Sequence, residues 1–125
     1  MKKFVLASLM SVFFSLPAFA EYLEYSENAY KLAVKNQERV VLDFHANWCP
    51  TCKAQAKSFK NLADDQDVGS IKVFKVDFDN SDELKKIHGV DKQSTLVLIE
   101  SGMEVDRSMG VSEEAELKTF LKQGK

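Results

Sequence analysis

Residues 40–53 read VVLDFHANWCPTCK, an apolar run that passes directly into a Cys-x-x-Cys pair. Cys49 and Cys52 are the only cysteines of the 125 residues. A pair with this spacing, placed where a strand turns into a helix, is either a redox site or half of a metal site. A purely structural disulfide is disfavoured, because closing so short a loop removes only about 2 kcal/mol of unfolded-state entropy.

The residues on both sides of the pair define one strand and one helix. Arg39–Ala46 is apolar except for a few polar positions, Asp43 among them, and predicts a buried strand. A helix is expected from about Cys49 to Ala63, and Pro50 suits its first turn, where the missing amide would be unpaired anyway.

Working outward, strand and helix patterns alternate along the chain, without an internal repeat or linker. The other predicted elements are an edge strand at Tyr22–Tyr25, a helix at Glu27–Asn36 capped by Ser26, a strand at Ile71–Phe78, a helix from an Asn80–Glu83 capping box to Gly89, two strands at Thr95–Ile99 and Met103–Met109 joined by Ser101-Gly102, and a last helix capped by Ser112. This order predicts an α/β fold with a central mixed β-sheet flanked by helices on both faces.

The first 20 residues predict a secretory signal peptide rather than part of the fold. Lys2 and Lys3 precede an apolar run from Phe4 to Leu16, and Ala18-Phe19-Ala20 is a small-x-small cleavage sequence. An uncleaved membrane anchor is the alternative, but the run is shorter than the roughly 20 apolar residues that span a bilayer. We therefore expect a leader at 1–20, a single domain at 21–125, and a mature protein in the periplasm without stable membrane insertion.

The charge of the mature chain limits its partners. Removing Lys2 and Lys3 with the leader takes two positive charges away, so the formal net charge changes from −2 to −4. A mildly acidic chain without a basic patch is a poor binder of nucleic acid. An export signal combined with one cysteine pair suits a compartment in which disulfides are exchanged.

The order of elements, with Trp48 to Lys53 at the second strand-to-helix junction, resembles the thioredoxin family. Val41 to Phe44, the cysteine pair, Lys75 to Asp77 and the Ser101-Gly102 hairpin all fall in the family's order and approximate spacing. The resemblance covers nearly all of the chain after residue 20. Among family members, the chain is most similar to exported thioredoxin-like proteins, such as the C-terminal domain of the bacterial transmembrane disulfide reductase.

The resemblance implies a role for three residues. Cys49, at the start of the helix, would be the attacking thiol, because unpaired amides and the helix dipole there stabilise a thiolate. Cys52, one turn further in, would resolve the mixed disulfide. Asp43 would lie buried beneath Cys52 with a raised pKa and would help to move its proton; a solvated strand-end aspartate is the alternative.

The surrounding residues admit two interpretations each. Lys75 matches the lysine that the family places near the buried acid, and it could equally face solvent. His45 lies on the same strand face as Asp43 and could tune Cys49 or bind a metal, although packing at the rim is favoured. Trp48 could touch partner proteins or simply pack beside the dithiol.

Ser94 departs from the family pattern, in which a cis-proline faces the dithiol. The Gln93–Ser94 bond is expected to be trans, because a cis bond before serine costs about 2.5–4 kcal/mol. Gln93 and Ser94 belong to the loop with which the family binds peptides, so this change is expected to weaken peptide binding. Ser94→Pro is then expected to improve turnover, unless the serine hydroxyl takes part at the site.

The sequence thus supports two functions. The first is an exported thiol–disulfide oxidoreductase acting on protein thiols and disulfides, as a monomer and without a cofactor. Thr51 lacks the charge of a histidine in the dithiol loop, which favours a reductant. The alternative is a metal-binding or metal-delivery protein that uses both thiolates and His45.

Overall fold

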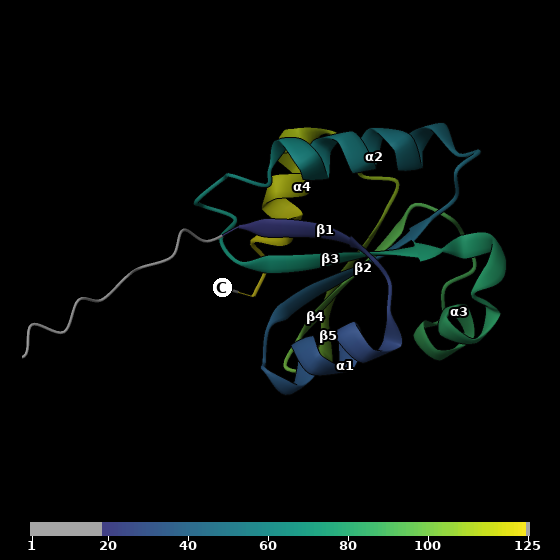
Figure 1. Cartoon of the computed structure of the whole chain (residues 1–125). Helices are drawn as coiled ribbons and strands as arrows, with labels where there is room; N and C mark the ends of the chain where they lie inside the picture. The colour runs from purple at the N-terminus through teal and green to yellow at the C-terminus, as the bar shows by residue number, and fades with distance from the viewer. Residues whose placement is uncertain (1–18, 125) are drawn as a thin grey trace, which may run out of the picture.

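A computed structural model describes residues 19–124 and places five strands in one sheet with the order β1-β3-β2-β4-β5 (Figure 1). The strands are β1 (Ala20–Glu24), β2 (Arg39–His45), β3 (Ile71–Asp77), β4 (Thr95–Glu100) and β5 (Met103–Met109). The helices are α1 (Glu27–Lys35), α2 (Pro50–Asn61), α3 (Asp82–His88) and α4 (Glu114–Leu121), with a 3-10 turn at Phe78–Asn80. The predicted leader at 1–20 lies almost entirely outside the described residues.

The central strand β2 is buried on both faces, which explains its apolar sequence. It pairs in parallel with β3 and antiparallel with β4. Val40, Leu42 and Phe44 point into a core shared with Ala33 of α1, whereas Val41 points into the core that α2 and α4 cover. Helices therefore pack on both faces of a mixed sheet, as the alternating pattern predicts.

The alternation of side chains along β2 positions the cysteine pair. Asp43 shares the face of Val41, because residues two apart point to the same side of a strand. β2 ends at His45, and α2 begins at Pro50 on the same face, so Asp43 points toward the helix that carries Cys52. In Figure 1, α2 starts at the right-hand end of the sheet.

Several predicted helix ends and turns agree with the structure. Ser26 caps α1 by accepting a hydrogen bond from the Ala29 amide at 3.3 Å. α3 ends at Gly89, whose φ of 62° is a left-handed conformation that suits glycine at this position. Ser101 and Gly102 both have positive φ, at 51° and 79°, as a two-residue hairpin turn requires.

Two predicted helix caps are wrong. Asn80 does not start α3 but ends the 3-10 turn, where its amide donates to the Asp77 carboxylate, and Ser81 takes the cap position without a side-chain bond. The short polar side chains of this segment bond locally and form a turn that competes with the helix. Ser112 does not cap α4 either: Glu113 takes the N-cap position, without a side-chain bond, and the Ser112 carbonyl accepts a hydrogen bond from the Ser58 hydroxyl at 2.7 Å.

The strand nearest the N-terminus starts earlier than predicted. β1 begins at Ala20 rather than Tyr22 and pairs in parallel with β3.

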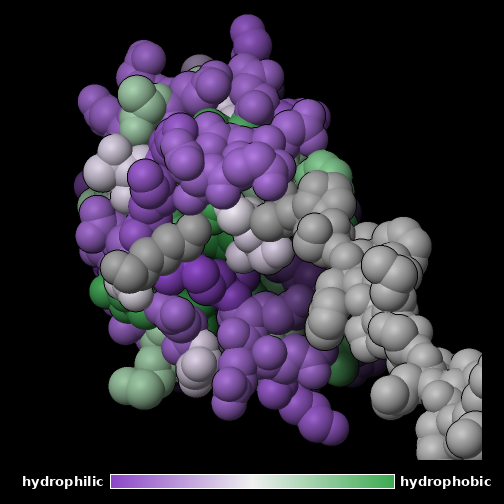
Figure 2. All heavy atoms as spheres, turned by 90° about the vertical axis from the view of Figure 1, so that its left-hand side faces the viewer, coloured by the Kyte–Doolittle hydropathy of each residue, from purple (hydrophilic) through white to green (hydrophobic). Residues whose placement is uncertain are grey.

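The end of the sheet where β1 begins lies away from the start of α2. Figure 2 looks onto this end, where hydrophilic side chains predominate. A hollow of about 550 Å³ lies at the same end and includes Phe19, Arg39 and Lys72 in its lining. Within residues 19–124, no helix is long and apolar enough to cross a membrane.

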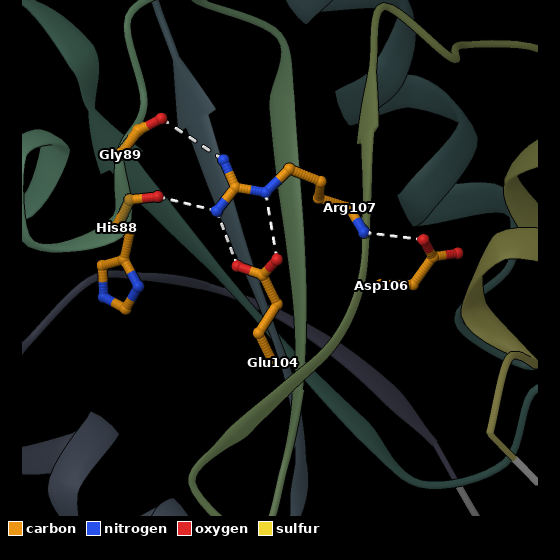
Figure 3. Close-up of polar contacts among 5 residues, drawn as sticks. All are labelled: His88, Gly89, Glu104, Asp106 and Arg107. Atoms are coloured by element: carbon orange, nitrogen blue, oxygen red, sulfur yellow. Dashed lines mark hydrogen bonds and ion pairs between the residues drawn. The ribbon is translucent and has the colours of Figure 1, made fainter.

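Arg107 of β5 ties the end of α3 to the sheet (Figure 3). Its guanidinium donates to the carbonyls of His88 at 2.7 Å and Gly89 at 3.3 Å, and it holds both carboxylate oxygens of Glu104. A planar guanidinium is well suited to several directed bonds at once. Arg107 therefore fixes the start of the loop that leads from Gly89 to β4.

Replacing Arg107 by alanine should loosen this loop while leaving the core intact. We expect Arg107→Ala to speed hydrogen exchange at the amides of Val90 and Ser94 about tenfold, because the lost bonds involve a charged donor. Lys31→Ala, which removes an exposed ion pair with Glu27, is the matched control and should change neither amide. Unchanged protection at both amides in Arg107→Ala would show that the loop does not depend on these bonds.

Candidate active site

The dithiol lies at the first turn of α2. Cys49 is the N-cap residue, and its sulfur accepts a hydrogen bond from the Cys52 amide at 3.2 Å. Both thiols are free, and only 3% of Cys49 and 0% of Cys52 is exposed. Phe78 packs on the small cluster that they form with Ala46. The predicted cap position of Cys49 and the deeper position of Cys52 are both confirmed.

The Ser94 hydroxyl lies between the two sulfurs. Its oxygen is 3.2 Å from the sulfur of Cys49 and 3.2 Å from the sulfur of Cys52. The three polar atoms are buried together, at the point where the loop before β4 meets the start of α2. The site therefore contains a third polar group in direct contact with both thiols.

The surroundings shift the two thiol pKa values in opposite directions. Burial alone would raise the pKa of Cys49, but hydrogen bonds from Cys52, Ser94 and backbone amides outweigh it and lower that pKa. Burial and the bond to Cys49 raise the pKa of Cys52, against smaller opposing contributions from Ser94 and a backbone bond involving Ala46. Cys49 is thus the thiol that ionises first, as a nucleophile must.

The backbone at Ser94 is unusual but well held. The Gln93–Ser94 bond is trans, as predicted. Ser94 has a φ of 66°, a left-handed conformation that costs a non-glycine residue about 1 kcal/mol. Its amide donates to the Phe44 carbonyl at 2.9 Å, and its carbonyl accepts from the Gly110 amide at 3.0 Å. Such strain persists only where the surrounding structure determines it strongly.

The observed backbone at Ser94 does not accommodate proline, so the expected gain in turnover from Ser94→Pro stays a prediction that would require a different loop conformation. Proline fixes φ near −65°, so it cannot adopt the observed conformation at this position. It would also remove the amide that bonds to Phe44. Proline here would rebuild the loop rather than simply restore the family pattern.

Gln55 is a buried residue next to the site that the sequence analysis did not single out. It is fully buried in α2, and its amide nitrogen donates to the carbonyls of Ser94 at 3.1 Å and Val111 at 3.0 Å. A polar residue three positions after Cys52, inside an apolar helix face, is the signal that could have revealed it. Gln55 ties the helix of the dithiol to the loop of Ser94.

Asp43 is fully buried, as predicted. Its Oδ2 accepts a hydrogen bond from the Tyr22 hydroxyl at 3.0 Å, while its Oδ1 is buried without a protein partner. Burial raises the pKa of Asp43 to about 7, although the Tyr22 bond and the Lys75 charge act in the opposite direction. Tyr22 also escaped the sequence analysis, because nothing in an edge strand indicates a partner on β2.

Lys75 and His45 lie near this acid without bonding to it. Lys75 is opposite Asp43 in the β2–β3 register, but its ammonium pairs with Glu24 at 2.7 Å. His45 is buried, and its Nε2 lies 3.2 Å from the Asn47 side chain. Burial and the charge of Lys75 lower the pKa of His45 below its usual value, which favours the neutral imidazole.

The two remaining predicted site residues lie at the periphery. Trp48 is 60% exposed, and its indole nitrogen donates to the Asp79 carboxylate at 2.9 Å. Gln93 is half-buried in the turn before Ser94. Across residues 19–124, no group of three or more His, Cys, Asp or Glu side chains is placed to hold a metal ion.

A buried dithiol at the start of a helix, with thiols of unequal pKa, defines a dithiol redox protein. Comparison with known proteins agrees with this class. The Thioredoxin family model matches residues 21–123, and the chain therefore belongs to the thioredoxin family.

Curated relatives and solved structures give the same result. Mitochondrial thioredoxin of Mus musculus is 34% identical over 89 residues, which are 71% of this chain and 53% of that protein. Thioredoxin H4 of Arabidopsis thaliana is 37% identical over 82 residues, 66% of this chain and 68% of that protein. The chain thus spans about half the length of the mouse relative.

Two solved structures confirm the fold. The structure of Trxlp from Edwardsiella tarda has a TM-score of 0.77 and 34% identity, and the alignment covers 82% of this chain and all of that one. A mutant thioredoxin from Halobacterium salinarum has a TM-score of 0.67 and 26% identity, covering 87% of this chain and 93% of the other. The predicted thioredoxin-like α/β fold is confirmed.

The raised pKa of Asp43 makes stability depend on pH. A carboxyl group that holds its proton more tightly when folded, at about 7 against 3.8, lowers the free energy of unfolding as pH rises between those values. The decline should be at most about 4 kcal/mol, and Asp43→Asn should remove it. Urea unfolding at a series of pH values measures both.

Two further variants sharpen this test. Tyr22→Phe removes a bond that favours the carboxylate, so the decline should extend to higher pH than in the wild type. Asp91→Asn, at an exposed aspartate, is the control and should keep the wild-type profile. A decline in Asp43→Asn as steep as in the wild type would refute the assignment of the effect to Asp43.

Proposed function

We propose that the protein is an exported thiol–disulfide oxidoreductase that reduces disulfides in partner proteins. The observation that carries this proposal is the placement of the two thiols: Cys49 is the N-cap of α2 and accepts a bond from the Cys52 amide, whereas Cys52 lies fully buried within the first turn, which separates an attacking thiol from a resolving one. The thioredoxin names of the relatives support the same activity. Thr51, which brings no charge into the dithiol loop, supports the reducing direction.

The reaction takes two displacement steps. The Cys49 thiolate attacks one sulfur of a partner disulfide, the partner's sulfur–sulfur bond breaks, and the other partner sulfur leaves as a thiolate. Cys52 then loses its proton and attacks the Cys49 sulfur, which releases the second partner thiolate. The partner gains two electrons, and the protein is left with a Cys49–Cys52 disulfide.

Asp43 is the proposed acceptor of the Cys52 proton. With a pKa of about 7 it is partly ionised at neutral pH, and its Oδ1 has no protein partner. A base with a pKa near the working pH transfers protons most effectively. Tyr22 holds the other oxygen and so orients the carboxylate.

Partner proteins would approach the dithiol from the surface next to Cys49. The indole of Trp48 supplies an exposed aromatic surface beside Cys49, and the loop at Gln93 and Ser94 borders the other side. Reduction of protein disulfides needs no cofactor, and the mature protein would act as a monomer with a redox partner in the same compartment.

Export rests on the leader sequence at 1–20. The match to the thioredoxin family begins at residue 21, directly after the proposed cleavage position. Cleavage after Ala20 would leave four residues of β1, including Tyr22 with its bond to Asp43. The protein recovered from the periplasm should therefore have an intact mass that starts at Glu21. Recovery of the uncleaved chain in the membrane fraction would contradict this.

The order of the two steps is tested by trapping. Cys52→Ala should accumulate mixed disulfides with exported proteins, because the second displacement cannot occur, whereas Cys49→Ala should accumulate few and lose insulin reduction. Non-reducing electrophoresis after acid quenching measures the mixed disulfides formed by each variant. Equal trapping by the two variants would exclude the assignment of Cys49 as the attacking thiol.

The metal-delivery alternative is decided by a separate measurement. It predicts that the reduced protein, purified from its native compartment, carries a stoichiometric soft metal ion that chelators do not remove. His45→Ala would then lower the affinity for this metal. An exchange-active protein without such a metal supports the oxidoreductase.

A further inference from the structure

We infer that the Ser94 hydroxyl is a third catalytic group of the redox centre, which donates a hydrogen bond to whichever sulfur carries the negative charge. This inference rests on the proposed function and adds a residue to its mechanism. It starts from one fact of geometry: the hydroxyl oxygen is 3.2 Å from both reacting sulfurs.

A hydroxyl has one proton to donate and can accept a second bond. In the reduced protein, the Cys52 thiol can therefore donate to the Ser94 oxygen while the Ser94 hydroxyl donates to the Cys49 thiolate. This arrangement stabilises a negative charge on Cys49 in a buried place where water cannot. It adds to the bond from the Cys52 amide at 3.2 Å.

The same hydroxyl can serve the second step. Once the Cys49 sulfur is bonded to the partner, it carries no negative charge and no longer needs a hydrogen-bond donor. Rotation about the Ser94 Cβ–Oγ bond, with the oxygen remaining in place, lets the hydroxyl donate to Cys52 as that thiol loses its proton. The group thus follows the charge from the attacking to the resolving sulfur.

The structure holds Ser94 tightly enough for this role. Its amide and carbonyl bond to Phe44, Gly110 and Gln55, and only 5% of the residue is exposed. Its φ of 66° is retained against an intrinsic cost. These backbone bonds fix the position from which the hydroxyl reaches both sulfurs.

Titration of the Cys49 thiolate tests the inference directly. Ser94→Ala and Ser94→Gly should each raise the Cys49 pKa by about one unit, measured by ultraviolet absorbance of the thiolate in the reduced protein. At a pH below that pKa, attack on a small disulfide should slow about tenfold. The mixed disulfide should also live longer, because Cys52 loses the same donor.

The choice of variants separates the hydroxyl from the backbone. Glycine relieves the positive φ whereas alanine does not, so equal shifts in both variants assign the effect to the hydroxyl. Ser101→Ala is the matched control, since Ser101 also has a positive φ, of 51°, but lies exposed in the β4–β5 turn. It should leave the pKa and the exchange rate unchanged.

Two outcomes would overturn the inference. One is a Cys49 pKa in Ser94→Ala equal to that of the wild type; the other is a shift in alanine that glycine abolishes, which would assign the effect to strain. Because the titration needs no substrate, it decides the role of Ser94 even if the wild type fails to reduce insulin. That failure would instead count against the proposed function.

Discussion

The burial of β2 on both faces is the constraint on which the rest of the structure depends. A strand at the centre of a sheet must be apolar on both sides, and its end must deliver the chain directly into α2. The start of α2 therefore lies just beyond the carboxyl end of β2, with Cys49 as its cap. The unpaired amides of that first turn face the sulfur that must carry a charge.

Polar groups inside this apolar frame define the chemistry. Asp43, Gln55 and Ser94 are all buried, and each bonds to a different element: Asp43 to β1, Gln55 to the loops before β4 and after β5, and Ser94 to the end of β2. A buried polar group costs free energy unless it is bonded, so these contacts hold the elements in one arrangement. The same contacts hold the thiols and the carboxylate in fixed positions relative to one another.

The site also balances burial against hydrogen bonding. Burial disfavours a thiolate, and at Cys52 it prevails. At Cys49 the bonds from neighbouring donors prevail, although that side chain too is nearly inaccessible. The difference between the two thiols comes from the deeper burial of Cys52 and from the larger number of donors that Cys49 reaches at the cap position.

Periodicity and residue types that are close together in the chain, as in residues 40–53, were enough to predict the sheet with helices on both faces and the place of the dithiol. The burial of Asp43 was predicted from the resemblance to the thioredoxin family. The predicted helix caps at Asn80 and Ser112 were wrong: the Asn80 amide bonds to Asp77 within the 3-10 turn, and the distant Ser58 hydroxyl holds the Ser112 backbone carbonyl just before α4. Only the tertiary structure placed Tyr22 against Asp43, Gln55 against Ser94, and the Ser94 hydroxyl between the sulfurs. Those contacts join residues 21 to 45 positions apart, and their geometry depends on how the strands and the helix pack rather than on any local preference.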